Sequence, residues 1–300
     1  MNDKDILIFD SKPTLKDPYI ICGFSGWING GEVSVASINY FIKQYNGLKF
    51  AEMPISRYHV YQIPGLESLR PVFKMQDGLI VETHLPKNQF YYAKNPVSEN
   101  DFIFFVGTEP SIKWEEYADT VVSLACDFGA SRLYTLCGIL TRTPYTREPH
   151  ISCTCTSDTI KEEMEKYNVT FSDRVGPATF NQMLIYACKK KGLEGVNFTV
   201  RVPCYPEYNV LIGYSPKSVK AVLVRLKDLM HLDMSFEELD NAIKEVEGKL
   251  DFFRQQNPEF NAYVEELEKD YVEMPYNESL DISPSDAIRL AEEFLKDNED

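Results

Sequence analysis

Four short runs of apolar residues constrain the fold of this 300-residue chain most strongly. They are YIICG (19–23), FIFFVG (102–107), LYTLCG (133–138) and FTVRVP (198–203). A continuous apolar run of this length predicts a strand that is buried on both faces, and such strands are typical of parallel sheets. The chain therefore predicts a sheet that is covered on both sides.

Amphipathic helices are predicted between these strands. Apolar residues recur every three and four positions from Val35 to Tyr45 and from Trp114 to Phe128. A third helix is predicted from about Thr179 to Lys191, where three lysines precede Gly192. Alternation of strands and helices indicates the α/β class.

One excursion interrupts the alternation. Residues 71–85 place Asp77-Gly78 between two β-rich segments, which is the usual signal for a β-hairpin. From this hairpin we predict that the sheet is mixed.

Charge divides the chain near residue 232. Residues 233–300 hold 21 of the 46 acidic and 6 of the 31 basic residues, which leaves 25 of each sign in residues 1–232. We therefore expect two units, an α/β domain over 1–232 and an acidic helical hairpin module over 233–300. An acidic module disfavours nucleic acid and anionic membranes as partners. It would suit a basic protein partner, unless it is only a solvated helix surface.

Helical signals continue through the acidic segment. Ser215-Pro216 predicts a capped helix that runs to about His231, and Ser235 with Glu238 predicts a capping box for the next one. Asn257-Pro258 ends that helix and caps another. A last helix is predicted from Ser283.

The cellular location is predicted from what the sequence lacks. No apolar run reaches the roughly 18 residues of a membrane helix, and residues 1–11 do not resemble a signal peptide. We expect a soluble, cytoplasmic protein. Seven cysteines are an odd number, and their apolar contexts favour reduced thiols over a disulfide framework.

Several polar and aromatic residues are predicted to meet at the carboxyl edge of the sheet, the usual ligand crevice of open α/β folds. The candidate ligand-binding residues are Trp27, Asn29, Gly30, Arg142, Tyr145, Arg147, Gly176 and Tyr205. The two arginines could hold a carboxylate or phosphate, or pair with carboxylates of the chain itself. The glycines after the first strand could form an anion nest or a plain turn, because they miss the spacing of known phosphate motifs.

A catalytic set is not recognisable. The four histidines are scattered, and only His150 lies next to the candidate arginines. No G-x-S-x-G motif is present. Cys153 and Cys155 alternate as in a half-buried strand, and no second pair has zinc-ligand spacing. We therefore predict neither a metal nor a cofactor, and the catalytic residues of any activity stay unknown.

Five motifs, in order and spacing, resemble the proteasome assembly chaperone 2 family. They are GWINGG (26–31), GILTRTPYTREP (138–149), VGPATF (175–180), VPCYP (202–206) and SPKSVKAVLVRL (215–226). The resemblance covers about residues 5–230 and continues into acidic helices typical of bacterial members. It implies a three-layer α/β fold similar to nucleoside phosphorylases and hydrolases, no established cofactor, and homo-oligomers that are often trimers.

The chain departs from the family pattern at two pocket positions. Tyr145 and Cys204 stand where the family usually has histidine. Eukaryotic relatives are chaperones of proteasome α-ring assembly, and some archaeal relatives dock through a hydrophobic-Tyr-X tail, which the last residues Asp297–Asp300 do not match. Proteasome binding by that route is therefore not expected.

Two functions follow from these observations. The favoured one is a non-catalytic assembly chaperone or scaffold that self-associates and binds a protein partner, with a proteasome connection implied by the resemblance. The alternative is an enzyme or binder of a small anionic or nucleoside-like ligand at the strand-end crevice.

Overall fold

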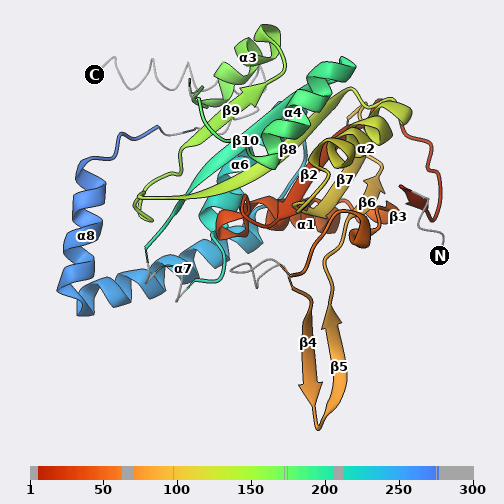
Figure 1. The fold of residues 1–300 in the computed structure, drawn as a ribbon. Helices are drawn as coiled ribbons and strands as arrows, with labels where there is room; N and C mark the ends of the chain where they lie inside the picture. The colour runs from red at the N-terminus through yellow and green to blue at the C-terminus, as the bar shows by residue number, and fades with distance from the viewer. Residues whose placement is uncertain are drawn as a thin grey trace, which may run out of the picture.

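The computed structural model describes residues 6–62, 70–96, 98–171, 173, 175–205, 208, 212–274 and 276. Its centre is an eight-stranded sheet with the order β1-β3-β6-β7-β2-β8-β10-β9 (Figure 1). The four apolar runs form the parallel strands in the middle of this sheet, which confirms the predicted α/β class. These strands are β2 (Tyr19–Ser25), β7 (Phe102–Thr108), β8 (Arg132–Thr141) and β10 (Glu194–Pro203).

Antiparallel strands border the sheet on both sides. On one side β6 pairs with β7, β3 with β6 and β1 with β3, and on the other side β9 pairs with β10. Their bounds are β1 (Ile8–Phe9), β3 (Leu48–Glu52), β6 (Gln89–Ala93) and β9 (Ile151–Cys155). The sheet is mixed as predicted, but these border strands make it so, because the 71–85 hairpin forms a separate sheet.

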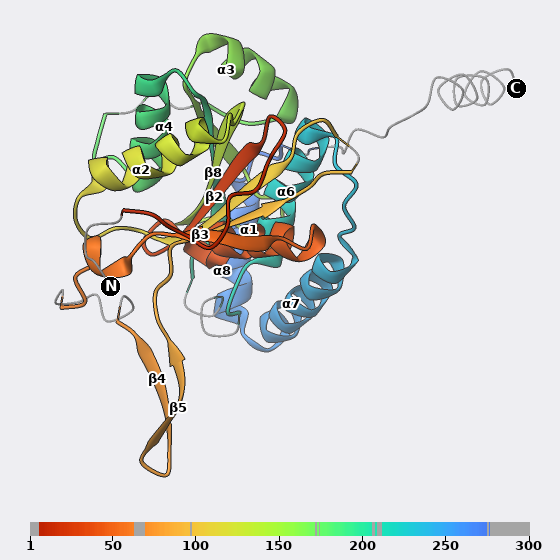
Figure 2. The ribbon, with the colours of Figure 1, turned by 90° about the vertical axis from the view of Figure 1, so that its right-hand side faces the viewer.

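Helices cover both faces of the sheet and complete three layers (Figure 2). Two apolar cores result, one on each face. Residues of α1 (Val33–Gln44) and α6 (Pro216–Met230) belong to the first core, and residues of α2 (Trp114–Asp127) and α4 (Phe180–Lys191) to the second. The short α3 (Asp158–Met164) adjoins β9, and single 3-10 turns occur at Gly30–Glu32, Ile55–Arg57 and Glu165–Tyr167.

Local signals set the ends of α4. The Thr179 hydroxyl accepts a hydrogen bond from the backbone N–H of Gln182, and the Gln182 side chain accepts one from the backbone N–H of Thr179. This capping box satisfies two donors that the first turn leaves unpaired. Gly192 ends the helix with a φ of 72°, a left-handed conformation that costs glycine little.

The hairpin consists of β4 (Val72–Gln76) and β5 (Leu79–His84) and projects from the body of the molecule (Figures 1 and 2). Asp77 and Gly78 both have positive φ, as a tight two-residue hairpin turn requires. Every residue of the two strands is exposed.

The acidic segment begins with α7 (Glu237–Gln256), followed at Asn257 by α8 (Pro258–Lys269), which meets α7 at an angle (Figure 1). Asn257 caps α8 as predicted, because its side chain accepts from the N–H groups of Glu259 and Phe260. The predicted capping box of Ser235 and Glu238 is wrong. Glu238 instead pairs with Lys43 of α1 at 2.6 Å.

The start of α6 also differs from the prediction. Ser215 does not cap the helix with its side chain, because its hydroxyl is hydrogen-bonded to that of Ser218 at 2.9 Å. The helix predicted from Ser283 lies outside the described residues. Within the described part of the chain, no helix has both the length and the apolar character to cross a bilayer.

Candidate functional site

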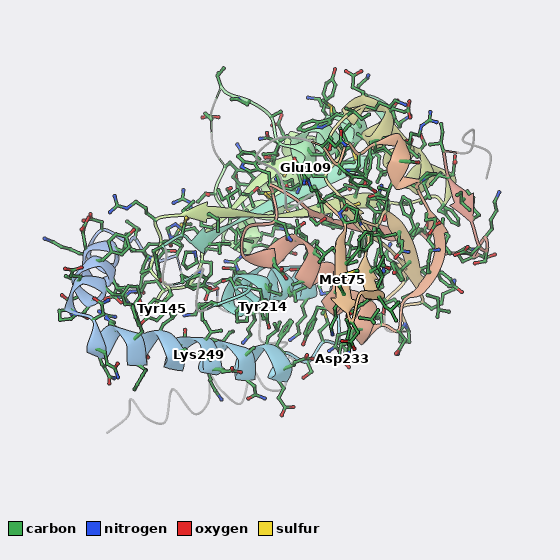
Figure 3. The ribbon with its side chains drawn as sticks, turned by 60° about the horizontal axis from the view of Figure 1, so that its bottom comes forward. Met75, Glu109, Tyr145, Tyr214, Asp233 and Lys249 are labelled. Carbon is green, nitrogen blue, oxygen red and sulfur yellow. The ribbon has the colours of Figure 1, made fainter. Side chains whose placement is uncertain are left out.

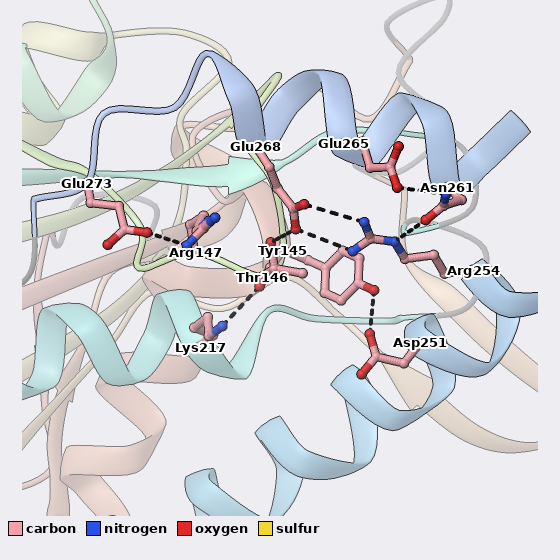
Figure 4. Close-up of polar contacts among 10 residues, drawn as sticks. All are labelled: Tyr145, Thr146, Arg147, Lys217, Asp251, Arg254, Asn261, Glu265, Glu268 and Glu273. Carbon is pink, nitrogen blue, oxygen red and sulfur yellow. Dashed lines mark hydrogen bonds and ion pairs between the residues drawn. The ribbon is translucent and has the colours of Figure 1, made fainter. Parts of the chain in front are cut away.

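The connection between β8 and β9, residues 142–150, forms what we call the corner. It carries Arg142, Tyr145 and Arg147, three of the candidate residues, and lies against α7, α8 and residues 270–274, which together we call the C-terminal arm (Figures 3 and 4). The carboxyl edge of the sheet is therefore covered at this point by the acidic end of the same chain.

An aromatic cluster holds the arm on the corner. Its buried members are Tyr145, Tyr205, Tyr208, Ile212, Leu250, Phe260, Val264 and Leu267. The Phe260 ring of α8 lies in its middle, with centroids 5.2 Å from Phe253, 5.6 Å from Tyr205 and 6.5 Å from Tyr145. Because Phe260 is only 3% exposed, the arm is packed on the body as a core element and is more than a surface helix.

Carboxylates of the arm pair with the corner. Arg142 meets Glu266 at 3.1 Å, and its guanidinium also lies over the Tyr263 ring. Arg147 pairs with Glu273, and the Thr146 hydroxyl donates to Glu268 (Figure 4). Both candidate arginines thus already have an anionic partner.

Two polar contacts are buried more deeply. The Tyr145 hydroxyl donates to Asp251 at 2.6 Å, and burial together with this carboxylate raises the pKa of Tyr145, which therefore stays a protonated donor. Burial opposes ionisation of Glu268, but its hydrogen bonds from Thr146 and Arg254 prevail and lower its pKa. Arg254 itself connects the two helices through Glu268 and Asn261.

His150 ends the corner. Its Nε2 is 2.7 Å from the carbonyl oxygen of Val272, and its ring stacks on Tyr271 at 4.4 Å. The Tyr271 hydroxyl donates to the carbonyl of Glu148. His150 is therefore held by the arm, as the arginines are.

Little space is left beside Tyr145 of the corner, although a cavity of about 370 Å³ lies farther along the arm, between α6 and α7. The cavity lined by Tyr145, Arg147, Lys217 and Glu247 measures about 20 Å³. A cavity needs roughly 10–15 Å³ to hold one water molecule, so a nucleoside or nucleotide does not fit in this cavity while the arm is docked. Lys217 closes the space by donating to the Tyr145 carbonyl at 3.0 Å and pairing with Glu247.

The remaining candidates lie in three different places. Asn29 and Gly30 lie at the base of the corner, where the Asn29 side chain accepts from the N–H of Val35 and Gly30 touches the Gly138 backbone. Trp27 is 81% exposed and Gly176 has open space around it, so neither belongs to the covered region. Tyr205 is buried within the aromatic cluster.

A further cavity, of about 290 Å³, opens at the carboxyl ends of β2 and β7. Ser25, Gly26 and Thr108 line its inner side, and Arg70 and His84 at the base of the hairpin line the other. Of these residues the sequence singled out only Gly26, one of the glycines weighed as an anion nest, although Ser25 and Thr108 closely follow two predicted strands. A hydroxyl pair 3.2 Å apart and two basic side chains could bind a small anion.

Beside this cavity lie two ionisable groups in buried positions. Burial lowers the pKa of His59 to about 4, so its imidazole is neutral at pH 7. Burial also raises the pKa of Glu109, whose carboxylate accepts from the N–H of Trp27 at 2.9 Å. Among the described residues, no group of three His, Cys, Asp or Glu side chains is arranged to hold a metal ion.

The sequence analysis did not identify the acidic residues of the C-terminal arm that contact the corner, namely Asp251, Glu266, Glu268 and Glu273. The only available signal was charge, since an acidic segment follows a corner with two arginines.

Comparisons with known proteins place the chain in a family. A sequence model described as the PAC2 family matches residues 23–253. The chain belongs to the PAC2 family.

Solved structures agree with the PAC2 assignment in fold. The chain is similar to the Mycobacterium tuberculosis proteasome-assembly chaperone homologue Rv2125, with 21% identity, a TM-score of 0.70 and coverage of 82% of this chain and 99% of that one. It is also similar to M. tuberculosis Rv2714, of unknown function, with 21% identity, a TM-score of 0.78 and coverage of 90% and 92%.

A third similar structure is that of Pyrococcus furiosus PbaB, an archaeal proteasome activator, with 22% identity, a TM-score of 0.62 and coverage of 82% and 97%. No curated protein matches the sequence significantly. At these identities the likenesses establish the three-layer fold, and what each relative does is a property of that relative.

Proposed function

We propose that the protein is a non-catalytic assembly chaperone or scaffold that self-associates and binds a protein partner, and that this role is related to the proteasome. The observation that carries the proposal is the covered corner. Its two arginines are paired with Glu266 and Glu273, and the cavity beside Tyr145 and Arg147 measures only about 20 Å³. A site for a small anionic substrate needs an open pocket with convergent polar groups, and the paired arginines of the corner do not offer one.

Family membership supports the proteasome connection. Rv2125 is a proteasome-assembly chaperone homologue and PbaB is a proteasome activator, and both share the fold. We further propose that residues 1–232 form the α/β body and residues 233–300 an acidic helical module, whose described part is docked on the body. A cytoplasmic homo-oligomer, with a trimer as the expected size, completes the proposal.

The test uses the full-length protein and purified proteasome α and β subunits from the same organism. Native gels would follow the formation of proteasome-sized particles with and without the protein, and native mass spectrometry would detect complexes with single subunits. Faster assembly together with a stoichiometric subunit complex is the expected result. If assembly is unchanged and no complex forms, the proteasome role is wrong.

A small anionic or nucleoside-like ligand is the second candidate, and the 290 Å³ cavity favours it. A ligand at 100 times its dissociation constant adds about 2.7 kcal/mol to stability, which a thermal-shift screen with phosphate, nucleosides and nucleotides detects. We expect Arg70→Ala to abolish such a shift and Arg142→Ala, outside this cavity, to retain it. No shift for any compound would rule this candidate out.

A further inference from the structure

The 370 Å³ cavity between α6 and α7 has a charged wall. Its volume lies within the range of roughly 300–1,000 Å³ that ligand pockets occupy. Helix α6, helix α7 and the corner all contribute side chains, so the cavity lies between the body and the arm. The charged residues that line it, among those described, are Glu148, Lys217, Lys220, Arg225, Asp240 and Glu247.

Four of these charges form ion pairs between α6 and α7. Lys220 pairs with Asp240 at 2.8 Å, and Lys217 pairs with Glu247. Because each pair joins a lysine of the body to a carboxylate of the arm, the four charges cancel where the helices meet. Arg225 and Glu148 are left outside these pairs.

Arg225 is a buried cation. It is only 1% exposed, and its guanidinium donates to the backbone carbonyls of Tyr167 at 2.9 Å and Ala221 at 2.7 Å. Its Tyr276 neighbour has the ring centroid 4.5 Å from the guanidinium carbon. Both carbonyls are neutral, and among the described residues Nη2 has no hydrogen-bond partner and no carboxylate forms an ion pair with Arg225. A buried cation is costly unless a counter-charge is supplied, and burial accordingly lowers the pKa of Arg225.

Glu148 is the anionic counterpart of Arg225 at the same cavity. Its backbone carbonyl accepts from the Tyr271 hydroxyl, but its carboxylate accepts no hydrogen bond from any described residue. Glu148 and Arg225 attract each other, yet they do not form an ion pair. Within the described part of the chain, the cavity therefore presents one unpaired cation and one unpaired carboxylate.

These two charges discriminate between kinds of ligand. A simple anion would meet Arg225 but would also be repelled by Glu148, and a simple cation would be repelled by Arg225. A compound that carries both a carboxylate and an ammonium group can form a charge-assisted hydrogen bond at each end. Like-charge repulsion at one end thus disfavours compounds that carry only one of the two groups.

We propose that this cavity binds a small zwitterion, namely an α-amino acid, with its carboxylate at Arg225 and its ammonium group at Glu148. The proposal goes beyond the proposed function, and the site shares no described lining residue with the 290 Å³ cavity. Because α6 and α7 both line the site, a bound amino acid contacts the body and the arm together and stabilises the docked arm.

The carboxylate end is tested by changing the compound, because replacing the buried Arg225 would also disturb the fold. A thermal-shift screen of the full-length protein covers the common amino acids and inorganic phosphate, and calorimetric titration follows for each active compound. We expect at least one amino acid to raise the melting temperature. Its decarboxylated amine and its deaminated acid are expected to bind about tenfold to a hundredfold more weakly, the factor that a hydrogen bond to a charged group contributes.

The ammonium end is tested by Glu148→Gln. Glu148 is exposed, so the variant is expected to fold. We expect it to bind the amino acid about tenfold to a hundredfold more weakly and to bind the deaminated acid no more weakly than the wild type does. The control is Glu245→Gln, which removes an exposed carboxylate of α7 that does not line the cavity and should leave the affinity unchanged. Hydrogen exchange of the α7 amides in the wild type should slow when the amino acid is present at saturation.

Each contrary result overturns a defined part of the reasoning. If no amino acid raises the melting temperature or binds in calorimetry, the proposed site is wrong. If phosphate or the deaminated acid binds the wild type as tightly as the amino acid, the site takes simple anions and the zwitterion is wrong. Unchanged affinity in Glu148→Gln, or unchanged exchange of α7, places the amino acid elsewhere on the protein. All of these results leave the proposed chaperone function standing, because proteasome assembly tests it separately.

Discussion

Replacing Phe260 by alanine tests whether packing or charge holds the C-terminal arm on the corner. Phe260 is 3% exposed and contacts three aromatic rings of the cluster, and truncation of such a phenylalanine costs about 3–5 kcal/mol. The Arg142–Glu266 pair has side chains that are 66% and 64% exposed, and pairs of that kind contribute about 0–1 kcal/mol. Packing is therefore expected to dominate.

Hydrogen exchange of the α8 amides measures the free energy of local opening. For Phe260→Ala we expect exchange to accelerate roughly a hundredfold to a few thousandfold, since each 1.4 kcal/mol is tenfold. For Arg142→Ala we expect about fivefold or less. Phe252→Ala, an exposed position on α7, serves as the neutral control.

Salt provides an independent measure. At 1 M ionic strength the Debye length is about 3 Å, so surface ion pairs are screened while apolar packing persists. If 1 M NaCl or Arg142→Ala opens α8 and Phe260→Ala does not, the arm is held by charge and our reasoning is refuted.

Three further predictions concern the body and the joint of the arm. Gly138→Ala would place a Cβ 2.1 Å from the Gly30 carbonyl oxygen, so we expect a loss of at least about 2 kcal/mol in urea unfolding, with Gly176→Ala unchanged because its surroundings are open. The pKa of His59 is lowered to about 4, so the unfolded state binds more protons between about pH 4 and pH 6.5, and stability should fall by roughly 2–3 kcal/mol as pH decreases through that window. A urea midpoint whose pH dependence is the same in His59→Gln would contradict this. Asn257→Ala should cost about 1 kcal/mol of local stability in α8, measured by hydrogen exchange of the Glu259 and Phe260 amides. If these amides exchange at the same rate in the variant and in the wild type, the cap contributes nothing.

The parts of the fold that the sequence predicted correctly depend on local patterns. Continuous apolar runs identified the four central strands, spacings of three and four identified α1 and α2, and the lysines before Gly192 identified α4. Asp77-Gly78 located the hairpin turn, because few other pairs accept two positive φ angles. The border strands β1, β3 and β6 were missed, since they are short and only partly apolar.

Failures arose where tertiary contacts compete with local ones. Ser235 and Glu238 have the spacing of a capping box, but the Phe236 ring stacks on Tyr40 and Glu238 reaches Lys43, so the chain enters α7 differently. At the corner, the sequence left open whether Arg142 and Arg147 bind a ligand or a carboxylate of the chain. Arg142 and Glu266 are 124 positions apart, and no local rule links residues at that distance.

The strand order also has a consequence for synthesis. Tyr19 in β2 pairs with Phe102 on one side and with Arg132 on the other. Both edges of β2 therefore stay unpaired until β7 and β8 have been synthesised. At about 5–20 residues per second, the ribosome needs on the order of 10 s to supply them. During that interval YIICG is exposed without its neighbouring strands, and unpaired apolar strands of this kind are prone to aggregation.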